Sequence, residues 1–376
     1  RQNVVTLTKD GGQVTGKISD LAVFSGLERS DVESAEAGEI VAISGLDEVN
    51  IGDTIADPSN PVALPRVTID EPTVQMTFSV NNSPFAGRDG KYLTSRHLRE
   101  RLFKELETNV SLRVQETDSA DRFLVAGRGE LHLGVLIEQM RREGYELQIS
   151  QPEVILHRDG DTVTEPFEEL TIQVPSEYQG PVIEEIGKRR GELRHMKLVN
   201  SEGTASEMHI EYHIPTRGII GLKNILLAKT RGTIIMHHVF SGYAPADEKA
   251  LLVAPHGSLV AFEAGTSTAY ALFMTQERGE LFIGASVEVY QGMVVGQNSR
   301  DEDLDVNVCK QKQLSNMRAA GTDEALVLTP PREMSLEFAM EYIGQDELVE
   351  VTPKYLRLRK RMLNPDDRRK AKKNAK

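Results

Sequence analysis

The sequence predicts a multidomain α+β fold: a small β region, two βαββαβ modules and a β-rich C-terminal domain. Three observations support this prediction. A chain of 376 residues exceeds one ordinary core, since domains average roughly 150 residues. Hydrophobic residues make up 39% and charged residues 27%, a globular composition. Helical and strand-like periodicities alternate through residues 71–245, with mostly strand-like runs on either side.

The first region, residues 1–70, is strand-like. Short apolar runs at 4–8, 13–18 and 40–43 are separated by Gly and Asp, as in a small barrel. Residues 11–17 match the spacing of a phosphate-binding loop up to the Lys, but Ile18 follows where Mg²⁺ requires a Ser or Thr hydroxyl. We therefore interpret this stretch as a β-turn and not as a nucleotide site.

Residues 71–158 form the first predicted module. Its elements, in order, are a strand at 73–80, a helix carrying Leu98, Leu102 and Leu106, strands at 112–116 and 122–126, a helix carrying Leu133, Leu136, Ile137 and Met140, and a strand at 145–150. Thr94 or Ser95 is available as the N-cap of the first helix, and Gly144 ends the second. The order βαββαβ is that of a ferredoxin-like module.

The same order recurs in residues 159–245. The predicted elements are a strand at 169–174, a helix from Pro181 to Gly191, a strand at 208–214, a helix at 218–229 and a strand at 233–240. The strand that should precede Met208 is not settled by the pattern. We expect a second ferredoxin-like module.

Residues 246–376 are predicted to be β-dominated. Strands are expected at 258–262, 269–274, 280–283, 287–290 and 324–328, with one helix at 335–342. The polar loop 297–322 is too long for an idle connection, and such loops are usually functional or disordered. From 354 onward the sequence has eleven Lys and Arg residues and two Asp residues, a net charge of +9, and we expect a basic, solvated tail there.

Charge, cysteine content and apolar runs limit the partners and the cell compartment that the sequence allows. The net charge of −13 argues at first against nucleic acid, so any RNA contact must rest on local cations. A single cysteine, Cys309, cannot form an internal disulfide and fits a reducing cytoplasm. The longest apolar runs are far below the roughly 20 residues of a membrane span. We expect a cytoplasmic monomer with no membrane segment. An initial Arg in place of Met, with no secretory signal, suggests a piece cut from a longer chain.

Two stretches carry a family resemblance. Residues 37–43 with 51–55 look like the closing strands of the β-barrel that follows the G domain in translational GTPases. Residues 127–133, Gly-Arg-Gly-Glu-Leu-His-Leu, are similar to the strand-to-helix signature in the third domain of elongation factor G. Here the two ferredoxin-like modules are adjacent, and the stretches 314–325 and 352–361 resemble the C-terminal domain of the BipA (TypA) family.

This resemblance implies an architecture and a role. The first region is expected to be a partial β-barrel, and the two modules to match the third and fifth domains of elongation factor G. The family likeness implies docking on rRNA and A-site tRNA of the 70S ribosome and the 50S subunit, with links to stress adaptation and large-subunit assembly. GTP and Mg²⁺ are expected in an absent G domain, so this part should have no cofactor, no metal and no catalytic residue of its own.

Candidate contacts follow the cations. Five cations in residues 188–197 exceed what the dipole of one helix end requires, although Arg189 and Arg190 in its last turn suit that role. The expected rRNA-binding residues are Lys188, Arg189, Arg190, Arg194, Lys197, Arg217, Lys223, Lys354, Arg357, Arg359, Lys360 and Arg361. The resemblance assigns the tRNA and peptidyl-transferase contacts to Lys310, Lys312 and Arg318 of the polar loop. The acidic start of that loop (Asp301, Glu302, Asp303, Asp305) departs from a phosphate-seeking pattern.

Two alternatives remain open. His209, Glu211 and His213 share one face of a strand and could serve a metalloenzyme, but they are spread over about 13 Å, which favours a solvated or RNA-facing surface. Paired ferredoxin-like modules also serve as regulatory proteins that bind small ligands between them. Zinc binding by equilibrium dialysis and a thermal-shift screen with nucleotides and amino acids distinguish these alternatives from RNA docking.

Overall fold

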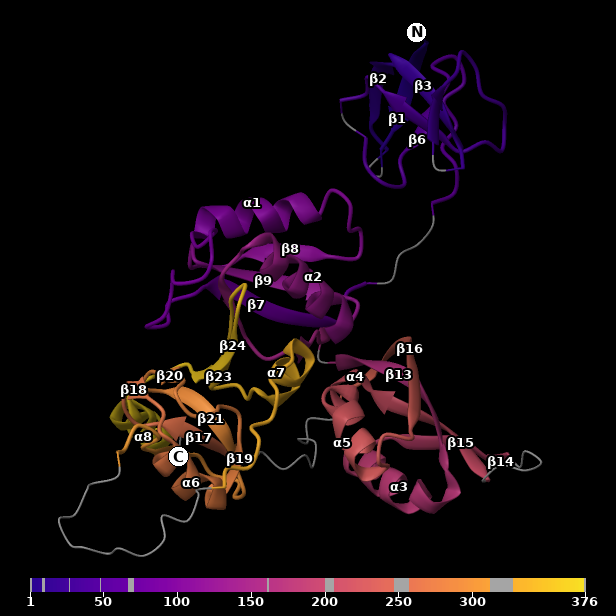
Figure 1. Ribbon diagram of the computed structural model, residues 1–376. Helices are drawn as coiled ribbons and strands as arrows, with labels where there is room; N and C mark the ends of the chain where they lie inside the picture. Colours follow the sequence, from indigo (N-terminus) through magenta and orange to yellow (C-terminus); the bar gives the residue numbers. More distant parts are fainter. Residues whose placement is uncertain are drawn as a thin grey trace, which may run out of the picture. The chain divides into compact units, whose positions relative to one another are not determined.

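The chain folds as a mixed α+β protein, described here from a computed structural model (Figure 1). The structure describes residues 2–8, 11–26, 28–47, 49–66, 71–160, 162–199, 206–246, 257–311 and 327–374. Two compact units are present, one made of Arg1–Asp70 with Phe103–Ser111 and the other of Glu71–Leu102 with Leu112–Lys376. The boundaries of the four predicted domains are not resolved by this division and stay a prediction.

The N-terminal strands form two small antiparallel sheets, ordered β2-β1-β6 and β4-β3-β5. Their bounds are β1 (Asn3–Leu7), β2 (Gln13–Lys17), β3 (Asp20–Ser25), β4 (Glu28–Asp31), β5 (Val41–Ser44) and β6 (Thr54–Ala56). Gly11 adopts a φ of 79° in the turn before β2, a conformation that suits glycine, so 11–17 is a turn and a strand as predicted. No closed barrel forms among the described part of this region.

The first βαββαβ module is confirmed by its strand order, β10-β7-β9-β8, in which the fourth strand neighbours the first. Its elements are β7 (Val74–Val80), α1 (Ser95–Glu105), β8 (Arg113–Glu116), β9 (Arg122–Gly127), α2 (Glu130–Glu143) and β10 (Leu147–Ile149), and β11 (Glu153–Val154) also pairs with β7. The predicted apolar stripe of α2 is fully buried. Thr94 accepts a hydrogen bond from the amide of His97 at 3.3 Å, and Gly144 closes α2 in the left-handed region.

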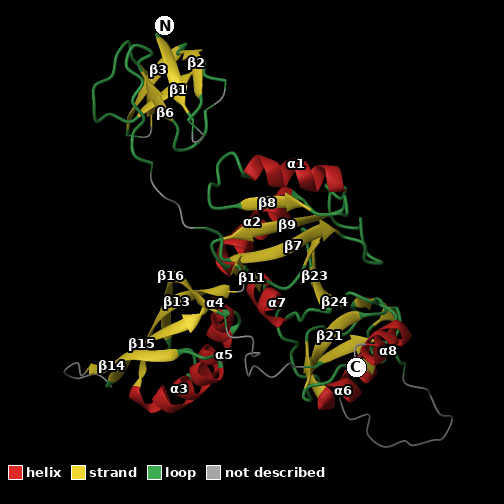
Figure 2. Cartoon of the chain, turned by 180° about the vertical axis from the view of Figure 1, so that it is seen from behind, coloured by secondary structure: helices red, strands yellow, loops and turns green. Residues whose placement is uncertain are grey.

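The second module repeats this order, with strands β16-β13-β15-β14 side by side. Its elements are β12 (His157–Asp159), β13 (Thr162–Pro175), α3 (Gln179–Lys188), β14 (Glu192–Val199), β15 (Glu207–Pro215), α4 (Thr216–Ile219), α5 (Leu222–Lys229) and β16 (Ile235–Pro245). The strand that the sequence left unsettled is β14. Helices α3 and α5 cover one face of the sheet (Figure 2), where Ile186 and Leu226 join the core with Ile210.

The C-terminal residues continue the sheet of the first module. Strand β23 pairs with β10 in antiparallel register, Leu147 opposite Val351 and Ile149 opposite Val349, so that one sheet of 11 strands results. Its elements are β17 (Ser258–Ala261), β18 (Gly265–Thr266), α6 (Ala269–Thr275), β19 (Gly279–Leu281), β20 (Glu288–Val289), β21 (Met293–Asn298), β22 (Leu304–Val306), α7 (Leu336–Tyr342), β23 (Glu347–Val351), β24 (Leu356–Lys360) and α8 (Pro365–Asn374). Phe85, from the loop after β7, packs edge-on against Tyr290 in this C-terminal core, with ring centroids 4.9 Å apart.

Several predictions for the C-terminal region need correction. The expected strand at 269–274 is helix α6, because Thr268 accepts a hydrogen bond from the Ala271 amide and caps it. The basic segment from 354 is not a solvated tail but strand β24 followed by helix α8. The polar loop begins with ordered strands, while residues 312–322 and most of the predicted strand 324–328 lie outside the described residues. Among the described residues, no helix is long and apolar enough to span a bilayer.

Candidate nucleic-acid interface

The cations at the end of α3 are largely engaged within the protein. Lys188 Nζ lies 2.7 Å from a carboxylate oxygen of Glu184, one turn earlier. Arg189 is 2% exposed, and its Nη1 donates to the carbonyls of Gly218 at 2.9 Å and Ile220 at 2.8 Å. Burial lowers the pKa of its guanidinium. This corrects the expectation for Arg189, which ties α3 to the α4–α5 connection and offers nothing to a phosphate.

Three further cations of this module differ in accessibility. Arg190 is half-buried and adopts a φ of 63°, so its backbone turns the chain from α3 into β14. Arg217 Nε lies 2.6 Å from the carboxylate of Glu165, whose side chain is 2% exposed. Lys223 is exposed near the start of α5. Only Lys223 of these three presents its charge openly to solvent.

Strand β14 is the most open part of the predicted surface. Among the described strands it lies at the edge of its sheet, paired with β15, and all eight of its residues are exposed. Arg194 lies 3.4 Å from Glu192, both side chains more than half exposed, which gives a weak surface pair. Lys197 forms no ion pair with any carboxylate in the described part of the chain. We call Glu192–Val199 the β14 edge.

Strand β24 turns two of its predicted contacts inward. Arg357 Nη1 lies 3.0 Å from a carboxylate oxygen of the fully buried Glu350, and its Nη2 lies 3.5 Å from Asp89. Arg359 is 3% exposed and donates to the side-chain oxygen of Asn82 at 2.8 Å. Both arginines therefore join the C-terminal sheet to the loop after β7, which corrects the expectation that they bind RNA.

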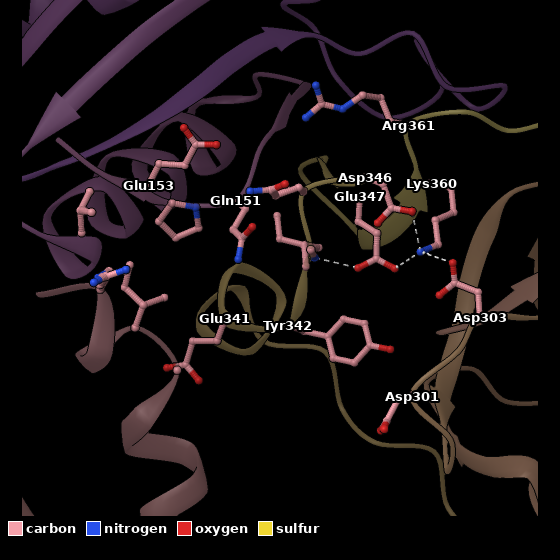
Figure 3. Close-up of a pocket in the computed structure, with 18 of the residues that line it drawn as sticks. Gln151, Glu153, Asp301, Asp303, Glu341, Tyr342, Asp346, Glu347, Lys360 and Arg361 are labelled. Carbon is pink, nitrogen blue, oxygen red and sulfur yellow. Dashed lines mark hydrogen bonds and ion pairs between the residues drawn. The ribbon is translucent and has the colours of Figure 1, made fainter. Parts of the chain in front are cut away.

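Lys360 is also an internal cation (Figure 3). Its Nζ lies 2.8 Å from Asp303, 2.9 Å from Glu347 and 3.1 Å from Asp346, and its side chain is 3% exposed. Burial opposes the charge of the ammonium group, but Glu347 and Asp303 outweigh this effect and raise the pKa of Lys360. The predicted contact at Lys360 is corrected in the same way, because its charge is already neutralised.

Five further predicted contacts either lie near the open surface or fall outside the described residues. Lys354 has a 67% exposed side chain 3.7 Å from Asp89, a distance at which solvent screens the pair. Arg361 and Lys310 are exposed. Lys312 and Arg318 lie outside the described residues, so the structure says nothing about the tRNA contacts expected there.

The acidic start of the polar loop has a structural use. Asp303 forms an ion pair with Lys360, and Asp305 in β22 forms one with the guanidinium of Arg368, a buried residue of α8. Burial acts to raise the pKa of Asp303, yet the hydrogen bond and charge of Lys360 leave it lowered. These carboxylates hold C-terminal cations, which explains why the loop departs from a phosphate-seeking pattern.

Helix α8 is a basic element that the sequence interpretation treated as a tail. The sequence does contain the residues that start this helix. Asn364 accepts a hydrogen bond from the Asp366 amide at 2.9 Å, and Pro365 takes the first helical position. Two aspartates occupy its first turn and cations its last, as the helix dipole prefers. Apart from the buried Arg368, its described cations are exposed: Arg369, Lys370, Lys372 and Lys373.

The histidine face of β15 follows the predicted alternation. Met208, Ile210, Tyr212 and Ile214 are buried, and the histidines on the other face contact carboxylates: His213 lies 3.0 Å from Glu169 and His209 lies 3.9 Å from Glu211. Within the described ranges, no three His, Cys, Asp or Glu side chains gather to hold a metal ion.

A cavity of about 1470 Å³ opens beside Lys360 in the second compact unit (Figure 3). Arg361 and Tyr342 line it, together with Glu341 from α7 and Asn224 from α5, which are hydrogen-bonded to each other. Cations and carboxylates of the lining are mostly paired, so the cavity shows no dominant charge that selects a ligand.

Comparison with known proteins accounts for this arrangement. A family model of the elongation factor G C-terminus matches residues 162–252, the second βαββαβ module. A model of the TypA/BipA C-terminal domain matches residues 256–365. The module order and these two matches define a protein related to elongation factor G.

Curated relatives narrow the class. Proteins named "Large ribosomal subunit assembly factor BipA" are 48% identical to this chain in Salmonella typhimurium, over 98% of the chain and 60% of the relative. The corresponding figures are 48%, 96% and 59% in Synechocystis, and 48%, 98% and 59% in Haemophilus influenzae. The chain belongs to the TypA/BipA family, and it spans about 60% of the length of these relatives.

Proposed function

We propose that this chain is the ribosome-docking part of a translational GTPase, binding rRNA of the 50S subunit and the 70S ribosome in the bacterial cytoplasm. The relatives named as large ribosomal subunit assembly factors support this assignment. GTP and Mg²⁺ act in a part of the whole protein that lies outside these residues. Residues 1–376 supply binding and not catalysis, and they act as a monomer in large-subunit assembly and stress adaptation.

The observation that carries the proposal is the open cationic charge of an otherwise anionic chain. The net charge is −13, yet Arg194 and Lys197 lie on an exposed edge strand. Phosphate binding releases condensed counterions and gains from each accessible cation, whereas the buried Arg189 and Lys360 contribute nothing. The β14 edge is therefore the leading rRNA contact, with Lys223, Lys354 and Arg361 as further open charges.

The polar loop is assigned to tRNA. Lys310 is exposed at its described end, and Lys312 and Arg318 follow it in the sequence. We assign these three cations to the acceptor arm of the A-site tRNA near the peptidyl-transferase centre. Substituting all three with Ala tests this without removing Asp305, which deletion of the whole loop would lose. Weaker binding to ribosomes that carry A-site tRNA, and unchanged binding to ribosomes without it, is the expected result.

Co-sedimentation with 50S and 70S particles tests the docking role. Affinity should fall steeply between about 50 and about 200 mM salt, and Arg194→Ala with Lys197→Ala should reduce the slope of log affinity against log salt by about 2 units. The matched control removes the same charge from α1 through Arg96→Ala and Arg99→Ala, both in exposed ion pairs with Glu100 and Glu116. Binding that ignores salt overturns the proposal.

A further inference from the structure

Helix α8 is fastened to the C-terminal domain by one buried cation. Arg368 is 9% exposed, and its Nη1 donates to the carbonyls of Leu363 at 2.8 Å and Met362 at 3.1 Å. Its Nη2 donates to the carboxylate of Asp305 in β22. These three hydrogen bonds of the guanidinium hold the helix start and the sheet edge together, so α8 is preformed and fixed in place.

Three of the four remaining described cations of α8 lie on its outward side. At 100° per residue, Arg369, Lys370 and Lys373 fall within about a third of the helix circumference, away from the side that carries Arg368. The side chain of Arg369 is 67% exposed and lies 3.3 Å from Asp366 and 3.7 Å from Asp305. That of Lys370 is 77% exposed and lies 3.9 Å from Asp367. Solvent screens such exposed pairs, so both charges stay accessible. Lys372 lies closer to the domain, 3.6 Å from Asp303. Lys370 and Lys373 therefore lie on the exposed cationic face, whereas Arg368 on the other side of the helix is anchored by Asp305.

The composition of α8 points to the kind of partner that it fits. Protein interfaces depend on a core of large apolar or aromatic side chains. The sequence Pro-Asp-Asp-Arg-Arg-Lys-Ala-Lys-Lys-Asn contains none, and its only apolar residues are Pro365 and Ala371. Phosphate oxygens, by contrast, need only accessible cations at close spacing. The exposed face matches a nucleic-acid backbone.

We propose that α8 is a preformed RNA-docking helix and that Asp305 and Arg368 are the positioning residues that hold it against the domain. The proposal rests on the proposed ribosome docking and names a second RNA contact within it. It also gives the acidic start of the polar loop a role in RNA binding that works through placement of α8 and not through contact with phosphate. Docking as a fixed helix avoids the ordering cost that a disordered basic tail incurs on binding.

The first test compares salt dependence. Lys370→Ala with Lys373→Ala should reduce the salt slope of 50S binding by about 2 units, while Arg96→Ala with Arg99→Ala leaves it unchanged. If the unaltered chain does not bind 50S particles, the proposed function itself is refuted. Normal binding by that chain, with an unchanged slope for the α8 variant, refutes this inference alone.

The probe also separates RNA from protein as the partner. Deproteinised 23S rRNA should show the same reduction in slope as intact 50S particles. A reduction seen only with intact particles means that α8 contacts a ribosomal protein, which overturns the RNA assignment.

The second test asks whether removing the negative charge of Asp305 weakens or strengthens RNA binding. Asp305→Asn removes a negative charge, so a purely electrostatic contribution strengthens RNA binding. Release of Arg368 from its partner should instead let α8 move and weaken binding severalfold. Asp367→Asn removes the same charge from the exposed first turn of α8, where the anchor stays intact, and should strengthen binding. Stronger binding by Asp305→Asn overturns the anchoring role.

Discussion

The cluster around Lys360 gives the sharpest stability prediction. Lys360→Met keeps the length of the side chain and removes its charge, leaving the nearly buried Glu347 and the partly buried Asp303 without their cation. Removing one partner of a buried ion pair costs about 3–5 kcal/mol, because the remaining charge is uncompensated. Asp346 adds little, since its side chain is 59% exposed and water screens it.

Urea unfolding followed by far-ultraviolet circular dichroism measures this loss. Lys354→Met is the matched control, because its ammonium is exposed and the pair with Asp89 should contribute at most about 0.5 kcal/mol. A loss below about 1 kcal/mol for Lys360→Met, similar to the control, would refute the reasoning. It would show that water reaches the cluster and replaces the missing cation.

The pH dependence of that loss has a defined sign. The folded-state pKa of Asp303 is lowered, so its contribution is fully present above the ordinary Asp value, near pH 4, and disappears as pH falls through the folded value. The difference between the original chain and Lys360→Met should therefore shrink in acid. A difference that stays constant down to about pH 3 contradicts this account.

Two further predictions concern α2. Burial first, then Glu341 and Glu337, raise the pKa of Glu130 to about 7, so its contribution to stability is full below about pH 4.5 and is lost as pH rises toward 7. At about pH 8, Glu130→Gln should raise the free energy of unfolding by up to about 3 kcal/mol and raise the thermal midpoint with it. At about pH 5 the same substitution should change the midpoint little. Equal effects at the two pH values would contradict this account. Gly144→Ala should destabilise the protein by about 1 kcal/mol, because φ is 99° at the end of α2. Gly134→Ala inside α2 should instead stabilise it by about 0.5 kcal/mol. Thermal unfolding that reverses this order would contradict the assigned cap.

Local patterns predicted the two βαββαβ modules because each element carries its own periodicity. The stripe of α2 and the alternation of β15 are set by residues a few positions apart, and both are confirmed. The run 269–274 misled because a short apolar stretch suits a strand or a helix equally, and the cap at Thr268 decides the outcome.

The candidate site was harder to predict because charge in a sequence does not reveal its partners. Lys360 and Arg361 are neighbours, yet the first is buried among carboxylates and the second is exposed. The partner Asp303 lies far away in the sequence, and only the pairing of β24 within the sheet brings it close. The RNA contacts assigned to these clusters of cations stay a prediction, and burial decides which of their charges are open to solvent.

The pairing of β10 with β23 has a consequence for any shortened version of the protein. Strand β10 would be the outer strand of the first module if β23 were missing, and its fully buried Leu147 and Ile149 would lose cover. An uncovered strand with free backbone groups is a template for joining other chains. Truncation before Glu347 should therefore yield an aggregating product and not a smaller soluble domain. Strand β23, close to the C-terminus, therefore covers the edge of a sheet whose first strand, β7, lies more than two hundred residues earlier.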